Sequence, residues 1–134
     1  MSIRAQIMNQ LEELQAKLGI SYLFIGHDLA TVAHISRRIA VMYLGQVVEL
    51  ADALELCHKP LHPYTQALFA AALPAHPDDQ RQPVAIKGEV PSALAPPSGC
   101  RFHPRCPLAM PRCCAEAPLR KEATTGHSVA CHLY

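Results

Sequence analysis

One short apolar run constrains the fold of this 134-residue chain more than any other feature. Residues 22–25 are aromatic or aliphatic throughout, which predicts a strand covered on both faces, as in a parallel sheet. Gly26 then permits a tight turn, and Asp28 can cap a following helix. His27 would therefore lie beyond the carboxyl end of a strand, where ligands gather in open α/β sheets. A histidine that only packs or caps at the strand end is the alternative that these residues leave open.

The residues around this strand predict helices and one hairpin. Apolar positions recur every three or four residues up to Leu18, and Gly19 follows, as is typical of an amphipathic helix and its end. Two β-type runs flank Gly45 and Gln46, which is hairpin spacing with glycine at the first turn position. The predicted elements are helices over 3–18, 29–36, 51–58 and 62–73, and hairpin strands over 38–44 and 47–50.

The composition changes in the second half of the chain. Six of the twelve prolines lie between Pro74 and Pro97, which predicts an extended linker. The tail after Gly99 holds five of the six cysteines and has too few apolar residues to be ordered by burial alone, so we expect a cross-link or a metal there. We therefore divide the chain into residues 1–58, 59–98 and 99–134.

The charge and hydropathy of the chain exclude some classes of partner. Twelve basic and eleven acidic residues give a net charge of +1, so the sequence carries no basic footprint for nucleic acid. No uninterrupted apolar run is long enough for a transmembrane helix, and the first residues lack the apolar core of a signal peptide. We expect a cytoplasmic protein, in which cysteines are more often metal ligands or reduced thiols than disulfides.

The spacing of the tail cysteines leaves their chemistry open. Five residues separate Cys100 from Cys106, six separate Cys106 from Cys113, and seventeen separate Cys113 from Cys131. None of these gaps is the tight pair that structural zinc sites usually contain, although His103, His127 and His132 could add nitrogen ligands. An iron–sulfur cluster is larger than one ion and tolerates wider spacing. Zinc, an iron–sulfur cluster, disulfides and free thiols all remain possible on the residues alone. Cys57 and Cys114 are not expected to be ligands.

Four motifs in order resemble a known family. They are F-I-G-H-D-L (24–29), H-I-S-R-R-I-A-V-M-Y-L-G (34–45), H-P-Y-T (62–65), and the tail G-C-R-F-H-P-R-C-P with G-H-x-V-A-C-H. Together they resemble the C-terminal part of the ATP-binding subunits of oligopeptide and dipeptide ABC transporters. The resemblance covers nearly the whole chain.

The resemblance implies a fold and an activity. The fold is α/β: a partial ABC-ATPase nucleotide-binding domain with one buried parallel-type strand, helices and a β-hairpin, followed by an extended tail rich in proline and cysteine. In this family two ATP-binding subunits close over ATP with magnesium on the cytoplasmic face of the membrane and drive peptide uptake through permease subunits. The expected partners are therefore a second ATP-binding subunit and the membrane permeases.

The resemblance also assigns roles to residues. His27 matches the switch histidine that contacts the ATP γ-phosphate and orients the attacking water. The cysteines that match the family's set hold a [4Fe–4S] cluster in some members, with zinc as the alternative here: Cys100, Cys106, Cys113 and Cys131. Arg37 stands where the family usually has aspartate, and Ala51 where glycine is common.

The sequence lacks the family's phosphate-binding loop, signature sequence and Walker B carboxylates. We expect the chain not to hydrolyse ATP by itself, and Met1 to mark either a true start or a truncation just after the family's D-loop. Two alternatives are a free-standing iron–sulfur or zinc module, and a regulatory remnant that pairs with a complete subunit. An exposed sheet edge at residues 22–25 would favour such pairing or self-association.

Overall fold

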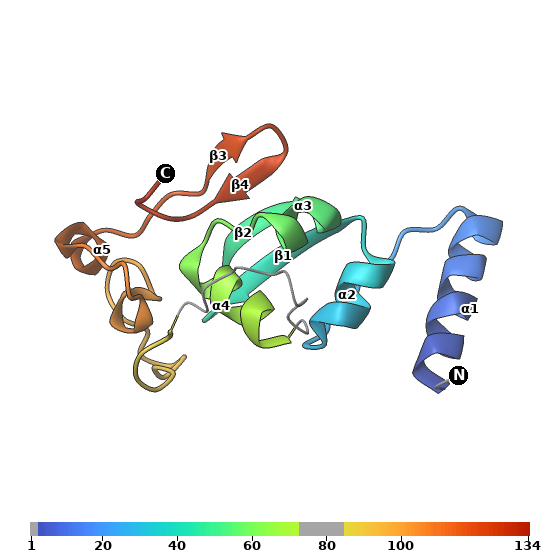
Figure 1. Cartoon of the computed structure of the whole chain (residues 1–134), viewed down its shortest axis with the longest axis horizontal. Coiled ribbons are helices and arrows are strands. Elements are labelled where there is room, and N and C mark those ends of the chain that lie inside the picture. The colour runs from blue at the N-terminus through green and yellow to red at the C-terminus, as the bar shows by residue number, and fades with distance from the viewer. Residues whose placement is uncertain (1–2, 73–84) are drawn as a thin grey trace, which may run out of the picture.

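The computed structural model describes residues 3–72 and 85–134. Its helices are α1 (Ile3–Leu18), α2 (Leu29–Ile35), α3 (Ala53–His58), α4 (Pro63–Ala72) and α5 (Pro111–Ala115), with a 3-10 turn η1 (His103–Arg105). Its strands are β1 (Arg38–Tyr43), β2 (Gln46–Asp52), β3 (Lys121–Thr124) and β4 (His127–Val129). Helix α1 lies at one end of the molecule, and the loops around α5 lie at the other (Figure 1).

The four strands form one antiparallel sheet in the order β1-β2-β4-β3. The predicted hairpin is confirmed as β1 and β2, but its turn lies one residue earlier than expected. Leu44 and Gly45 occupy the turn with φ of 44° and 78°, so glycine is at the second position. Two left-handed turn residues match the twist of a two-residue hairpin, which explains the shift.

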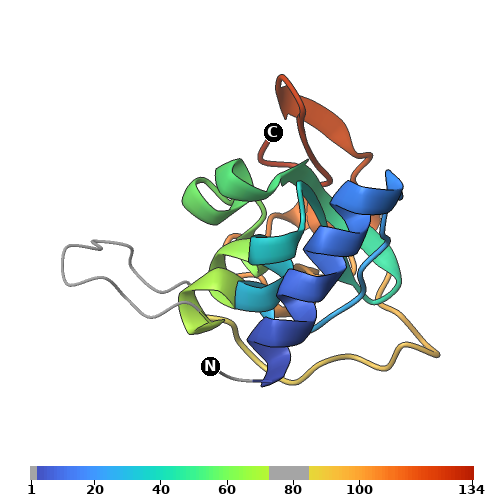
Figure 2. The ribbon, with the colours of Figure 1, turned by 90° about the vertical axis from the view of Figure 1, so that its right-hand side faces the viewer.

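The core lies where the β1–β2 hairpin meets three helices. Alternate β1 residues, Ile39, Val41 and Tyr43, point inward, and α3 contributes the fully buried Leu56. Helix α2 contacts both α3 and α4, and Figure 2 shows α2 and α4 next to each other. The β3–β4 hairpin extends beyond these helices at the top of the same view. The helices thus cover one face of the hairpin and leave its outer edge, β1, unpaired within the described ranges.

The predicted buried strand at residues 22–25 is wrong. The segment is extended but joins no ladder, and Leu23 and Ile25 are 91% and 89% exposed. A strand buried on two faces needs neighbouring strands and covering helices, and the described part of this chain offers only an antiparallel sheet elsewhere. Only Phe24 packs partly against the core. The architecture is therefore mixed helix and antiparallel sheet, without the parallel-type strand.

The predicted amphipathic helix is confirmed as α1, and Gly19 follows it with φ of 64°. Its amide donates to the carbonyl of Gln15 at 2.9 Å, as in a left-handed helix end. The apolar stripe is not buried, however, and Ile3 and Leu18 are largely exposed. The helix forms from its own periodicity, whereas burial of the stripe requires a surface that the described residues do not supply.

The tail is attached to the rest of the fold through its last strand. Glu49 and Leu50 of β2 pair with Val129 and Ser128 of β4, so residues from both halves of the chain share one sheet. The sequence analysis did not anticipate β3 and β4. The first part of the predicted proline-rich linker, residues 74–84, lies outside the described residues. None of the helices in the described ranges combines the length and the apolar character needed to cross a bilayer.

Candidate functional site

His27 lies between the exposed extended segment and helix α2, and it is exposed itself. The predicted cap is confirmed, because the Asp28 carboxylate accepts from the Thr31 amide at 3.3 Å and from its hydroxyl at 3.1 Å. A Cβ on Gly26 would lie 3.1 Å from the ring of Phe24 and 3.2 Å from Val32. The backbone on both sides of His27 is therefore fixed, while its imidazole is not a core packing group.

The four cysteines of the predicted metal site are brought together from separate parts of the tail. Cys100 and Cys106 flank η1, and the Cys100 amide donates to the carbonyl of Cys113 in α5 at 2.8 Å. Cys131 follows β4. Burial raises the pKa of the Cys131 thiol, and the other three thiols raise it further. Burial likewise raises the pKa of Cys100, with Cys113 and Cys106 adding to it, so the thiols lie close enough for their charges to interact.

Gly99 makes this gathering of cysteines possible. It has φ of 64°, and an added Cβ would collide with the carbonyl oxygen of Cys113 and lie 2.8 Å from the carbonyl carbon and oxygen of Cys114. The backbone before Cys100 can therefore lie directly against α5 only because residue 99 has no side chain. Ser98 reinforces the contact, since its hydroxyl donates to the Cys114 carbonyl at 2.9 Å.

The gathered cysteines do not form a site for a single ion. Among residues 3–72 and 85–134, no group of three or more His, Cys, Asp or Glu side chains has the arrangement that one metal ion requires. Two of the nearby histidines face backbone carbonyls instead: His103 Nδ1 lies 2.9 Å from the oxygen of Cys100, and His132 Nε2 lies 2.9 Å from that of Glu116. The described residues therefore give no evidence for zinc or for an iron–sulfur cluster.

Phe102 docks the cysteine-bearing loops onto the body of the protein. It is 1% exposed, and its ring centroid lies 5.2 Å from that of Tyr43, 5.5 Å from Tyr64 and 5.6 Å from His62. The neighbouring Arg101 donates to the carbonyl of Leu44 in the hairpin turn. The H-P-Y-T motif and the tail motif therefore meet in one aromatic cluster, which gives a physical reason for both.

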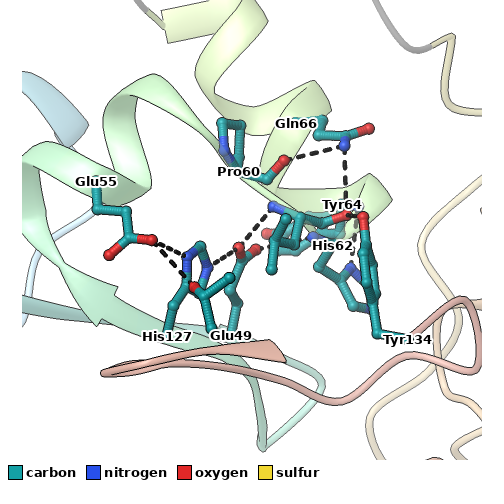
Figure 3. A network of polar contacts seen from close by, with 10 residues as sticks. Glu49, Glu55, Pro60, His62, Tyr64, Gln66, His127 and Tyr134 are labelled. Carbon is teal, nitrogen blue, oxygen red and sulfur yellow. Dashed lines mark hydrogen bonds and ion pairs between the residues drawn. The ribbon is translucent and has the colours of Figure 1, made fainter. Parts of the chain in front are cut away.

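A buried polar network joins β2, helix α3, the loop before α4 and the tail (Figure 3). The Glu49 carboxylate is fully buried and accepts from the amides of Leu61 at 2.7 Å and His62 at 3.0 Å. His127, 1% exposed, places Nε2 2.7 Å from Glu49 and Nδ1 3.1 Å from Glu55. A buried carboxylate is costly unless it is paired and hydrogen-bonded, and here both conditions are met.

His62 differs from His127 in its partners, because it contacts a backbone amide and aromatic rings. Its Nδ1 accepts from the Tyr64 amide at 3.1 Å, so the ring uses this nitrogen as an acceptor at the first turn of α4. Burial lowers the pKa of His62 to about 4, with the nearby Glu49 acting in the other direction. The ring is therefore neutral at pH 7, and it serves as a cap and an aromatic contact.

The sequence analysis missed Glu49, Glu55 and the role of His127. Glu49 stands in the β-type run V-V-E-L. A carboxylate within such a run indicates that a buried hydrogen-bond partner is needed. The strand register explains the burial of this carboxylate, because Glu49 pairs with Val41 and its side chain therefore points to the same core face. The position of His127, four residues before Cys131, suggested only a possible ligand.

Comparison with known proteins places the chain in a class. Residues 48–113 match the family described as oligopeptide/dipeptide transporter, C-terminal region. Over nearly its whole length the chain is similar to ATP-binding proteins of peptide ABC transporters, and it corresponds to their C-terminal part.

Individual relatives cover nearly all of the chain. It is 54% identical over 132 residues to the probable peptide ABC transporter ATP-binding protein y4tS of Sinorhizobium fredii, which is 98% of this chain and 37% of that protein. It is 50% identical over 135 residues to the oligopeptide transport ATP-binding protein AppF of Bacillus subtilis, with 99% and 41% covered. It is 48% identical over 132 residues to OppF of Escherichia coli, with 97% and 39% covered. The chain thus spans about two fifths of the length of these curated relatives.

Proposed function

We propose that this chain supplies the switch histidine and the cysteine-bearing tail of an ATP-binding subunit in a peptide importer. The observation that carries the proposal is the identity of 48–54% to peptide-transport ATP-binding proteins over 97–99% of the chain. The full activity needs ATP with magnesium, a second ATP-binding subunit and membrane permease subunits, and it takes place on the cytoplasmic face of the membrane. The chain alone lacks the phosphate-binding elements and should not hydrolyse ATP.

His27 is the residue that we assign to the chemistry. Its exposure, between a fixed glycine turn and a capped helix, suits a side chain that must reach a phosphate supplied by another part of the subunit. There it contacts the ATP γ-phosphate and orients the attacking water, a positioning task that phosphoryl transfer requires.

We assign the cysteine group to a [4Fe–4S] cluster on the resemblance to the family, in which some members hold one. The four thiols are half-buried or buried, and no three of the described His, Cys, Asp or Glu side chains are placed for one ion. A cluster is wider than an ion and takes one thiolate at each iron. The residues that would hold it are Cys100, Cys106, Cys113 and Cys131. Such a group supplies either a structural cross-link or a one-electron redox centre.

A chimera tests the role of His27. This chain would replace the matching 135 residues of AppF, and oligopeptide uptake would be measured in cells that depend on the chimera. We expect His27→Ala to retain ATP binding but to lose ATP hydrolysis and uptake by about 10²-fold or more. The exposed histidine at the end of α3 provides the control, since His58→Ala should behave as the parent chimera. Unchanged hydrolysis in His27→Ala would refute the assignment.

Iron and sulfide analysis tests the cysteine assignment. Chain purified without oxygen should contain about four iron and four sulfide per molecule and absorb broadly in the blue. Cys113→Ser should reduce both contents, whereas Cys114→Ser, the exposed neighbour, should leave them unchanged. One zinc without sulfide, or no metal with all thiols titrating, would contradict the cluster.

The comparisons give no support to the two alternative functions. A free-standing metal module would not need the α1 to α4 segment to match transport ATP-binding proteins as closely as it does. A pairing remnant would need a free sheet edge, and β1 and β3 are the edges that the described residues leave open. Size-exclusion chromatography of the chain mixed with a complete subunit checks the second idea.

A further inference from the structure

We infer that His127 is a positioning residue for Cys131, because its buried ion pairs with Glu49 and Glu55 hold strand β4 in place and thereby bring the fourth cysteine to the other three. The inference rests on the proposed role of the cysteines. It concerns a residue that lies outside the cysteine group and acts on it only through the backbone.

The backbone alone holds β4 weakly. The strand has three residues, and two of its positions pair with β2. One further bond follows, from the Ala130 amide to the carbonyl of Val48 at 2.8 Å. The partner strand β3 is exposed along its whole length, so it adds no burial. A short strand with so few bonds requires side-chain anchors to stay docked.

The anchors of β4 are Val129 and His127, each 1% exposed. Both ring nitrogens of His127 face carboxylate oxygens, at 2.7 Å and 3.1 Å. Each ring nitrogen therefore has a carboxylate within hydrogen-bond distance, so the imidazole joins β2 and α3 from the buried face of β4.

The far side of the network is equally well fixed. Glu49 already accepts two amides from the loop before α4, so its carboxylate cannot follow β4 if the strand moves away. Glu55 also accepts from the hydroxyl of Thr124 in β3 at 3.3 Å, which ties both strands of the tail hairpin to α3. Loss of the imidazole would leave the buried Glu49 carboxylate without its side-chain partner.

The side-chain hydrogen bonds of the residues after β4 lie at the surface. His132 meets the carbonyl of Glu116 at 2.9 Å, and the Tyr134 hydroxyl donates to the carbonyl of Leu61 at 3.3 Å, both at exposed positions. Exposed bonds of this type contribute little when the adjacent strand is free to move. Cys131 lies two residues after the end of β4, so its position depends on how this strand is docked.

Hydrogen exchange on the full chain tests the positioning role without any metal. In His127→Gln we expect the amides of residues 128–130 to exchange roughly tenfold faster or more, with the β1–β2 amides unchanged. The control is His34→Gln, which removes an exposed histidine that lies 3.8 Å from Glu12 and far from the tail. Unchanged exchange in β4 would overturn the inference.

The cluster provides the second measurement. Reconstitution with ferrous iron and sulfide should give a lower cluster content in His127→Gln than in His34→Gln or the parent chain. The same substitution made in a Cys131→Ser background should cause no further loss, because the ligand that His127 positions is already gone. A further loss would show that His127 acts by another route.

Glu55→Gln keeps the inference testable if His127→Gln does not fold. This substitution removes the partly exposed carboxylate and leaves the buried pair of His127 and Glu49. The exchange of the β4 amides should therefore rise less than in His127→Gln. Exchange equal to that of the parent chain would count against the inference. If the parent chain takes up no iron but β4 still loosens, the cluster proposal fails and the docking role of His127 stands. If the parent chain takes up iron, but neither β4 exchange nor cluster content changes in His127→Gln, only the docking role of His127 is refuted.

Discussion

The segment between α1 and α2 and the C-terminal tail are built in opposite ways. The first is rich in aromatic and aliphatic residues, yet Leu23 and Ile25 are almost fully exposed. The tail has few such residues, yet Phe102 and Val129 are buried in the body of the protein. The difference is whether a complementary surface exists within the described residues. The tail meets an aromatic cluster and a strand edge, whereas the first segment meets neither.

Phe102→Ala should have the largest effect on stability. The ring fills a cluster with Tyr43 and Tyr64, so its removal leaves a cavity and should lower the free energy of unfolding by about 4 kcal/mol. Urea unfolding measures this directly. Leu23→Ala is the matched control from the other segment and should change the value by less than about 0.5 kcal/mol. Comparable losses in the two variants would break the comparison.

Gly99→Ala should be nearly as damaging, for a reason that is steric rather than hydrophobic. The added methyl would collide with the carbonyl of Cys113, and the left-handed backbone adds strain, so we expect a loss of about 3 kcal/mol. Gly88 has a similar φ of 68° and nothing within 4 Å, so Gly88→Ala isolates the strain at about 1 kcal/mol. Equal losses in thermal unfolding would mean that the close approach to α5 carries no weight.

Acid should lower the free energy of unfolding through His62. Because burial lowers its pKa from 6.5 to about 4, the unfolded chain binds the proton more readily. The contribution of a neutral His62 is therefore complete above pH 6.5 and is lost as the pH falls toward 4, up to about 3 kcal/mol.

His62→Asn separates this effect from other titrations. Its side-chain oxygen can still accept from the Tyr64 amide, but it does not titrate. Urea unfolding between about pH 7.5 and pH 4 should show a flatter pH dependence for the variant than for the parent chain. Identical slopes would contradict the assignment to His62.

Thr65→Val should have the smallest effect and the opposite sign. Thr65 is fully buried, and its hydroxyl has no hydrogen-bond partner among the described residues. Replacing the hydroxyl by a methyl of similar shape should raise the free energy of unfolding by about 1 kcal/mol. A loss of stability instead would show that the hydroxyl has a partner.

Local patterns in the sequence were sufficient to predict most elements of the first half. The stripe up to Leu18, the glycine after it, the cap at Asp28 and the β1–β2 hairpin are all encoded within a few residues of each other. The strand at residues 22–25 could not be judged in this way, because burial of a strand depends on its neighbours. An apolar run indicates only that the segment needs neighbouring elements to cover it.

The same distinction between local patterns and long-range contacts applies to the candidate site. The resemblance assigned the cysteines, but spacing alone could not show that Gly99 fits against α5 or that His127 contacts Glu49 and Glu55. Gly99 acts through a contact with α5, and His127 through carboxylates 72 and 78 residues away in sequence. Contacts of this range leave no periodic pattern to detect.

The order of the strands has a consequence for biosynthesis. The ribosome makes β2 before β4, and the two strands join across a separation of 78 residues between Glu49 and His127. Long-range pairing of this kind is slow, and it cannot begin until β4 has left the ribosome. Until then the Glu49 carboxylate lacks its partner His127. Docking of β4 is therefore a late step in folding, and the β1–β2 hairpin must form before its buried carboxylate is fully paired.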